Sequence, residues 1–177
     1  EQERWLSEGL SQSKRQWKLV AQATQISPTS VPAPVGRSYW NDAWDGYPEA
    51  RKRLLQTVVD AKLHNVVTLG GDVHCNVAAN LRLEPNNLQS PIVASEFVTT
   101  SITSRGLGDK PAAAIRDSNA DLLHYRSDER GYSLITVTPS GVRCDFRTTK
   151  FPAGSEAGFK TQASYVVKNG KAGPQLL

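Results

Sequence analysis

The segment from Asn65 to Asn76 reads NVVTLGGDVHCN, and this stretch decides the fold class. Residues 65–69 are short, apolar and rich in β-branched side chains, which is typical of a strand buried on both faces. The strand ends at Gly70 and Gly71, which let the backbone turn sharply and let a ligand approach closely. We therefore expect a buried strand followed by a loop with polar side chains.

The segment before this strand, from Tyr47 to His64, predicts a helix. Pro48 suits its first turn, where the missing N–H group of proline costs nothing. An apolar stripe follows at helical spacing, formed by Leu54, Leu55, Val58, Val59 and Leu63. A helix that leads directly into a buried strand is typical of an α/β fold.

The remaining segments add further elements. Near the start, the patterns predict an amphipathic helix over residues 1–13, a strand within 17–23 and a proline-rich loop over 25–38. In the middle of the chain they predict a short helix near Asn76, a strand over 92–99 and a Ser/Thr/Gly-rich loop over 100–110.

The C-terminal region predicts a β-hairpin. Residues 132–138 and 142–147 flank the turn sequence Pro139-Ser140-Gly141. Val142, Cys144 and Phe146 alternate with charged residues in the second strand, which places Cys144 on the core face. A last strand near residues 164–167 precedes an Asn-Gly turn at 169–170.

Composition limits the function classes. The chain has 177 residues, 38% of them hydrophobic and 21% charged, which suits one globular domain. The net charge is +4, but the basic residues form short scattered runs, which favours solvated helices over a nucleic-acid surface. No apolar run approaches the roughly 20 residues that span a bilayer, and no signal peptide is visible. Cys75 and Cys144 leave one disulfide open as a possibility.

Asp72 and His74 are the candidate metal ligands. In an extended chain, residues two positions apart point to the same side. Ligands in α/β folds usually lie at the C-terminal ends of strands, and a carboxylate with an imidazole is a common mixed ligand set. The alternative is structural: Asp72 caps the short helix expected near Asn76, and His74 packs locally. Two ligands alone do not complete a metal site.

Five sequence blocks resemble the PhoD-like alkaline phosphatases, a branch of the metallophosphoesterases. The blocks follow in order and in register at Gln2–Leu6, Asp42–Arg51, Gly71–His74, Ala94–Ile102 and Arg130–Tyr132. The third is Gly-Asp-Val-His, and the last is Arg-Gly-Tyr before the final hairpin. Their shared order across nearly the whole chain is far more specific than any single block.

The resemblance implies a fold, a site and a location. Residues 1–177 would form the C-terminal half of a single domain, a four-layer α-β-β-α sandwich with a mixed sheet and a C-terminal hairpin. Asp72 and His74 would bind metal, with iron and calcium as the ions, for hydrolysis of phosphate mono- and diesters outside the cytoplasm, in a secreted, periplasmic or cell-surface enzyme. Glu96 would either orient a metal ligand or be a buried, paired carboxylate.

Several family motifs are missing from this sequence. They lie upstream in the family and supply most of its metal ligands, and the chain begins with Glu1 and contains no Met. We therefore expect a partial enzyme that needs the N-terminal half of the same protein. An isolated half-sheet would expose an edge, which predicts self-association.

Three other interpretations compete with a metal-dependent phosphoesterase. A non-catalytic α/β module would keep the scaffold and serve as a binding or structural unit. A thiol nucleophile at Cys75 lacks an orienting third residue, and adjacent strand residues point apart. A serine nucleophile elbow is excluded because the sequence contains no Gly-x-Ser-x-Gly.

Overall fold

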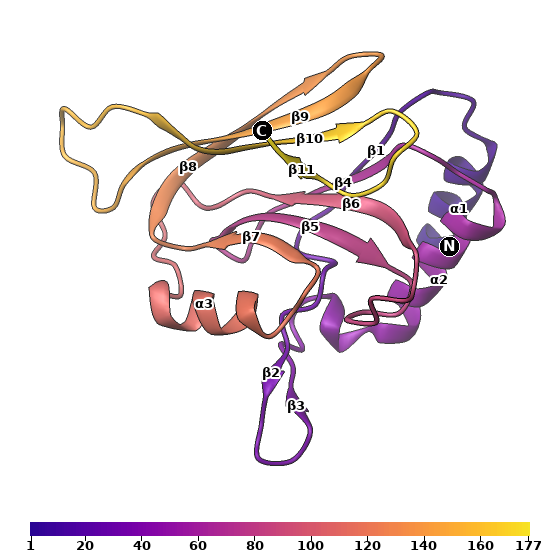
Figure 1. Cartoon of the computed structure of the whole chain (residues 1–177), viewed down its shortest axis with the longest axis horizontal. Coiled ribbons are helices and arrows are strands. Elements are labelled where there is room, and N and C mark those ends of the chain that lie inside the picture. Colours follow the sequence, from indigo (N-terminus) through magenta and orange to yellow (C-terminus); the bar gives the residue numbers. More distant parts are fainter.

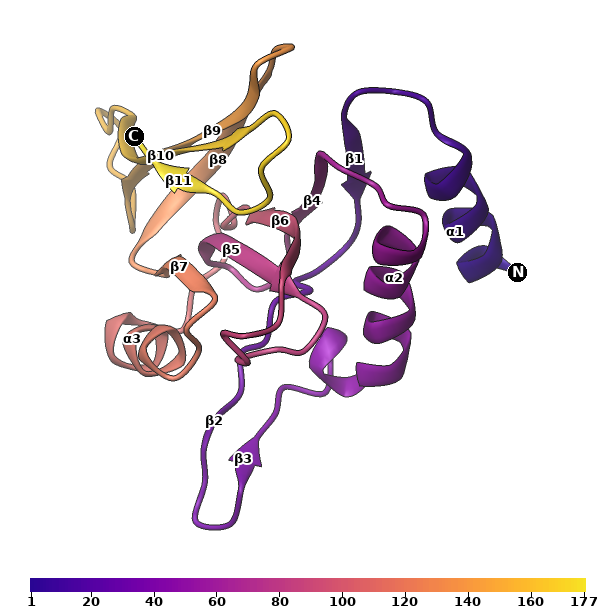
Figure 2. The same ribbon diagram turned by 45° about the vertical axis from the view of Figure 1, so that its right-hand side comes forward.

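Two β-sheets lie face to face, with helices against one of them (Figures 1 and 2). The computed structural model describes residues 1–177. In chain order the elements are α1 (Gln2–Gln12), β1 (Lys18–Ala21), β2 (Val31–Pro32), β3 (Arg37–Ser38), the 3₁₀ turn η1 (Trp44–Gly46), α2 (Pro48–Asp60), β4 (Val66–Gly70), β5 (Asn76–Arg82), β6 (Ile92–Val98), α3 (Asp109–Asp117), β7 (Leu122–Arg126), β8 (Glu129–Val137), β9 (Gly141–Lys150), β10 (Lys160–Lys168) and β11 (Gln175–Leu176).

The first sheet is mixed and has the strand order β1-β4-β6-β5-β7. Strands β1, β4 and β6 are parallel, whereas β5 pairs antiparallel with both β6 and β7. The expected strand buried on both faces is β4: Val66 packs among the residues of α1 and α2, and Val67 packs against the second sheet. The predicted helix before it is α2, with Pro48 in its first turn. The α/β fold is therefore confirmed.

The second sheet has the order β11-β10-β9-β8 and is antiparallel throughout. The predicted hairpin is confirmed as β8 and β9, and Cys144 lies fully buried on the core face. Phe146 on this sheet meets Phe97 of β6 edge to face, with the ring centroids 6.4 Å apart. Aromatic and smaller apolar side chains together fill the layer between the sheets.

Helices cover only one side of the pair of sheets (Figure 2). Leu10 of α1 and Leu55 of α2 pack with Val66 and Leu81 of the first sheet, while Ala112 of α3 packs near β7. The outer face of the second sheet leaves Tyr132 and Leu134 largely exposed. The chain therefore contributes three layers, in the order helices, mixed sheet and antiparallel sheet.

Two segments differ from the sequence-based expectations. The short helix predicted near Asn76 is wrong, because β5 begins there and every residue from Asn76 to Leu81 is buried between its neighbouring strands. Helix α2 ends at Asp60, four residues before the predicted end at His64, because Lys62 adopts a left-handed backbone with φ of 51°. Neither α3 nor β7 was expected.

The proline-rich loop carries a short arm formed by β2 and β3. The arm extends away from the sheets (Figure 1), and Val35 near its tip is 92% exposed. None of the helices is both long and apolar enough to cross a membrane.

Candidate metal centre

The Gly71–Cys75 loop connects β4 to β5, at the carboxyl end of the parallel strand β4. Gly70 allows the segment from Gln22 to Thr24 to pass close by, since a Cβ there would collide with the carbonyl oxygen of Thr24. No such close contact exists at Gly71. The sequence therefore located the loop correctly, with the close approach at the first glycine of the pair.

The backbone of this loop is strained at the two candidate ligands. Asp72 has φ of 70° and His74 has φ of 53°, values that non-glycine residues seldom adopt. The loop is not extended, so the argument from alternating side chains in a strand does not apply to it. Asp72 does not cap a helix either, because a strand begins at Asn76. Backbone strain of this kind clusters at functional sites.

His74 is oriented by a hydrogen bond from its ring. Its Nδ1 atom lies 2.7 Å from the carbonyl oxygen of Arg105. Because a carbonyl oxygen only accepts hydrogen bonds, Nδ1 carries a proton, and in the neutral ring the lone pair is therefore on Nε2. Metal-binding histidines are usually held in this way through their other nitrogen.

Asp72 is exposed, and its carboxylate makes neither a hydrogen bond nor an ion pair within the chain. Four other aspartates, by contrast, have carboxylates paired with an arginine, namely Asp117, Asp121, Asp128 and Asp145. The acidic group on the strained loop is thus left available.

Arg130 holds the backbone of the loop in place through hydrogen bonds. The sequence analysis did not identify this role. Its guanidinium donates from Nη1 to the carbonyl oxygens of His74 at 3.0 Å and Ser104 at 3.2 Å, and from Nη2 to the carbonyl oxygen of Ser127. The guanidinium also lies over the ring of Phe151, 5.6 Å from its centroid. The only signal was the Arg-Gly-Tyr block, in which Gly131 permits close contact with the Arg147 backbone.

Glu96 lies in a different environment. Its side chain is fully buried, and its carboxylate accepts hydrogen bonds from the backbone N–H groups of Ile26 at 2.7 Å and Ser27 at 2.8 Å. Arg51 donates from Nε to the carbonyl oxygen of Ile26, also buried. Burial raises the pKa of Glu96, opposed by these hydrogen bonds and by Arg51. No hydrogen bond joins Glu96 to Asp72 or His74, so these contacts favour a buried, paired carboxylate.

The family block around residue 45 also serves the structure. Asp45 accepts hydrogen bonds from the backbone N–H and the hydroxyl of Thr29, at 2.9 and 3.0 Å. It does not cap α2, whose N-cap residue is Tyr47 and has no side-chain hydrogen bond. Asp45 and Glu96 thus both hold the segment that leads from β1 into the arm.

The cysteines are both free and buried. Burial raises the pKa of the Cys75 thiol, opposed by hydrogen bonds with Ser127 and Tyr125, and burial raises the pKa of Cys144 to about 12. A protonated, inaccessible thiol is a poor nucleophile, which argues against chemistry at Cys75.

No group of three or more His, Cys, Asp or Glu side chains is arranged to hold a metal ion.

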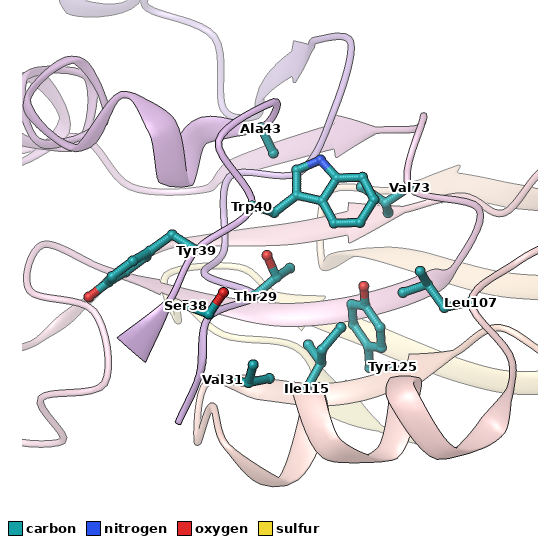
Figure 3. Close-up of a pocket in the computed structure, with 10 residues that line it drawn as sticks. All are labelled: Thr29, Val31, Ser38, Tyr39, Trp40, Ala43, Val73, Leu107, Ile115 and Tyr125. Carbon is teal, nitrogen blue, oxygen red and sulfur yellow. The ribbon is translucent and has the colours of Figure 1, made fainter. Parts of the chain in front are cut away.

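A small apolar pocket adjoins the loop. Its volume is about 170 Å³, and it is lined by residues of the arm, of α3 and of β7, together with Val73 between the two candidate ligands. Figure 3 shows Trp40 and Val73 on one side of the pocket, and Ile115 and Tyr125 on the other.

Comparison with known proteins gives a consistent result. Residues 1–146 match the family model described as PhoD-like phosphatase. The chain is 37% identical over 176 residues to alkaline phosphatase D of Bacillus subtilis (strain 168), which covers 98% of this chain and 30% of that protein. A solved structure described as "Structure of PhoD" superposes with a TM-score of 0.90 at 34% identity, covering 99% of this chain and 34% of that one.

Proposed function

We propose, because the chain belongs to the PhoD-like phosphatase family, that it provides part of a metal-dependent site for hydrolysis of phosphate mono- and diesters. Asp72 and His74 are the metal ligands in this proposal. The observation that supports it most strongly is the state of the loop: the backbone has positive φ at both residues, and the Nδ1 atom of His74 is already bound, which orients its ring.

The two donors fit a metal ion chemically. Carboxylate oxygen and neutral imidazole nitrogen are ligands that iron accepts, and calcium accepts the carboxylate. Iron and calcium are the ions we propose, on the family resemblance. When bound, such ions polarise a phosphoryl oxygen and lower the pKa of a bound water.

The protein supplies rigidity to these donors. Arg130 holds the carbonyl oxygen of His74, and the carbonyl oxygen of Arg105 fixes the ring of His74. Preorganised ligands lose little conformational freedom on binding, which strengthens binding without any additional contact.

The remaining ligands come, in this proposal, from residues equivalent to the rest of a PhoD-like enzyme. The chain spans 30% of the length of alkaline phosphatase D, and within the chain no third ligand joins Asp72 and His74. In this proposal the natural partner is an N-terminal half of the same enzyme. The family resemblance supports a phosphoester substrate outside the cytoplasm.

Metal titration of the 177-residue chain, followed by nuclear magnetic resonance, tests the ligands directly. Mn²⁺, a paramagnetic probe, should broaden the signals of residues 71–75 first. Asp72→Ala and His74→Ala should each remove this selectivity. Asp60→Ala and His64→Ala, which change exposed residues of the same types, should retain it. Equal broadening in all the variants would contradict the ligand assignment.

Hydrolysis separates the enzyme from the alternative. The alternative is a non-catalytic binding or structural module that keeps only the scaffold. Bis-p-nitrophenyl phosphate should be hydrolysed, with iron and calcium supplied, only after the N-terminal half of a PhoD-like enzyme is added. If Asp72→Ala hydrolyses the ester as fast as the unchanged chain does in that mixture, the module interpretation holds.

Self-association of the isolated chain is part of the same proposal. Strand β8 is an edge strand, and Leu134 and Val137 on it are each about half exposed. Sedimentation at micromolar concentration should show species larger than the monomer. A clean monomer would count against this expectation.

A further inference from the structure

The apolar pocket beside the Gly71–Cys75 loop has the size of one aromatic ring. Its volume is about 170 Å³. A buried cavity of roughly 150 Å³ lined by apolar side chains is large enough to bind benzene. The pocket therefore fits a single ring with few substituents.

The chemistry of the walls selects a neutral guest. Eight of the ten lining residues are hydrophobic, and none carries a charge. Thr29 and Ser38 supply the only aliphatic hydroxyl groups. Trp40 and Tyr125 provide aromatic surfaces, on which another ring packs in an edge-to-face or offset arrangement. A phosphate group has no positively charged partner in this pocket, so it does not enter.

The location of the pocket connects it to the candidate metal centre. Val73 lines the pocket, and its two neighbours in sequence are the candidate ligands Asp72 and His74. Leu107 also lines it, two residues after Arg105, whose carbonyl oxygen holds the ring of His74. The Gly71–Cys75 loop and the segment that holds the ring of His74 thus each contribute one side chain to the pocket wall, Val73 and Leu107 (Figure 3).

We propose that this pocket binds the aromatic alcohol portion of a phosphate ester whose phosphate group lies at Asp72 and His74. The inference rests on the proposed function, because it assigns a substrate class to that site. Trp40 is the specificity-determining residue: this residue is 52% exposed before binding, and the guest covers part of its exposed surface. Aryl phosphates are then preferred over phosphates of small alcohols.

The pocket is tested first without any phosphate. Phenol is added to the 177-residue chain, and the indole N–H signal of Trp40 and the methyl signals of Ile115 are followed by nuclear magnetic resonance. Both should shift together with one affinity. Trp40→Ala should weaken phenol binding about 10-fold or more, since it removes most of an aromatic wall. Ile115→Phe should abolish binding by filling the space.

Trp5→Ala is the matched control, since Trp5 lies on α1 and is 72% exposed. It should leave phenol binding unchanged. An unshifted Trp40 signal, or phenol binding that survives both Trp40→Ala and Ile115→Phe, would overturn the inference.

The second measurement joins the pocket to the metal centre. With the N-terminal half of a PhoD-like enzyme added and iron and calcium supplied, phenyl phosphate should bind about 10-fold or more tightly than methyl phosphate. Ile115→Phe should reduce phenyl phosphate to the affinity of methyl phosphate. Equal binding of the two esters by the unchanged chain would overturn the placement of the ring.

The two proposals fail in different ways. If the Asp72→Ala variant binds both esters as the unchanged chain does, but phenol still shifts Trp40, the proposed function fails and the pocket remains. If Asp72 is needed for both esters but phenol has no effect on Trp40, the inference about the pocket fails and the proposed function remains.

Discussion

Two carboxylates of the mixed-sheet layer are in opposite states. Glu96 on β6 is fully buried and accepts hydrogen bonds from two backbone N–H groups. Asp72, just beyond β4, is exposed on a strained backbone and has no partner within the chain. A carboxylate that holds the fold has its hydrogen bonds completed by the protein, whereas a carboxylate available for a ligand does not. The comparison shows which of the two carboxylates the fold uses and which one it leaves free to bind a ligand.

The largest expected effect is on the structural side of this comparison. Glu96→Ala leaves the N–H groups of Ile26 and Ser27 buried without acceptors, which should lower the free energy of unfolding by about 3 kcal/mol. Urea unfolding followed by circular dichroism measures this. Glu156→Ala, at an exposed glutamate, should change stability by less than about 0.5 kcal/mol. Similar changes in the free energy of unfolding for Glu96→Ala and Glu156→Ala would contradict the structural role of Glu96.

The next effect lies where the two regions meet. Arg130→Met removes the donors to the carbonyl oxygens of His74, Ser104 and Ser127. The loss should lower the free energy of unfolding by about 2 kcal/mol in the same assay. It should also weaken the selective Mn²⁺ broadening at residues 71–75, because the loop loses its support. Arg15→Met changes an exposed arginine and should do neither. A purely structural role would lower stability and leave the broadening intact.

A small gain in stability is expected at Asp72, the proposed metal ligand. Asp72→Gly relieves the positive φ, which should raise the free energy of unfolding by about 0.5 kcal/mol while the metal response is lost. Lys62→Gly, at φ of 51°, should give a similar gain with the metal response intact. A clear loss of stability in Asp72→Gly would place Asp72 among the structural carboxylates.

The smallest expected effect extends the comparison to histidine. His124 stacks on Phe146, its Nε2 atom is 3.0 Å from the Gln162 side-chain oxygen, and burial lowers its pKa. The unfolded chain therefore takes up a proton more readily than the folded one as the pH falls through about 6.5, and the folded state loses stability.

Unfolding at pH 7.5 and at pH 5.5, two values on either side of the usual pKa of histidine at about 6.5, checks this. The stability of the unchanged chain should fall more over this interval than that of His124→Gln. His64→Gln, at an exposed histidine, should behave as the unchanged chain. The same pH dependence in all three would mean that His124 is not the group responsible.

The sequence was most informative where burial follows a simple pattern. The apolar run of β4, the stripe of α2 and the alternation around Cys144 each determine an element and its buried face. Strand β5 was misread because its sequence, NVAANLR, contains alanines that suit a helix, and a fully buried strand has no period to reveal it. Helix α3 was missed although Asp109 and Pro111 mark a helical first turn.

The candidate site was predictable only in part. The residue types and the glycines located Asp72 and His74, but the positive φ values depend on surroundings that the local sequence does not specify. The contact between Arg130 and His74 joins residues 56 positions apart. The pocket likewise combines the arm, the loop, α3 and β7, which only the folded chain brings together.

The β2–β3 arm makes this chain suited to fluorescent labelling. Val35 is 92% exposed and has open space around the neighbouring Gly36, while Cys75 and Cys144 are both fully buried. A thiol-reactive dye would therefore label the folded Val35→Cys variant at position 35 alone. The native cysteines would not need to be removed. Because the arm also forms part of the pocket wall, its tip is a natural position for a sensor of aromatic ligands.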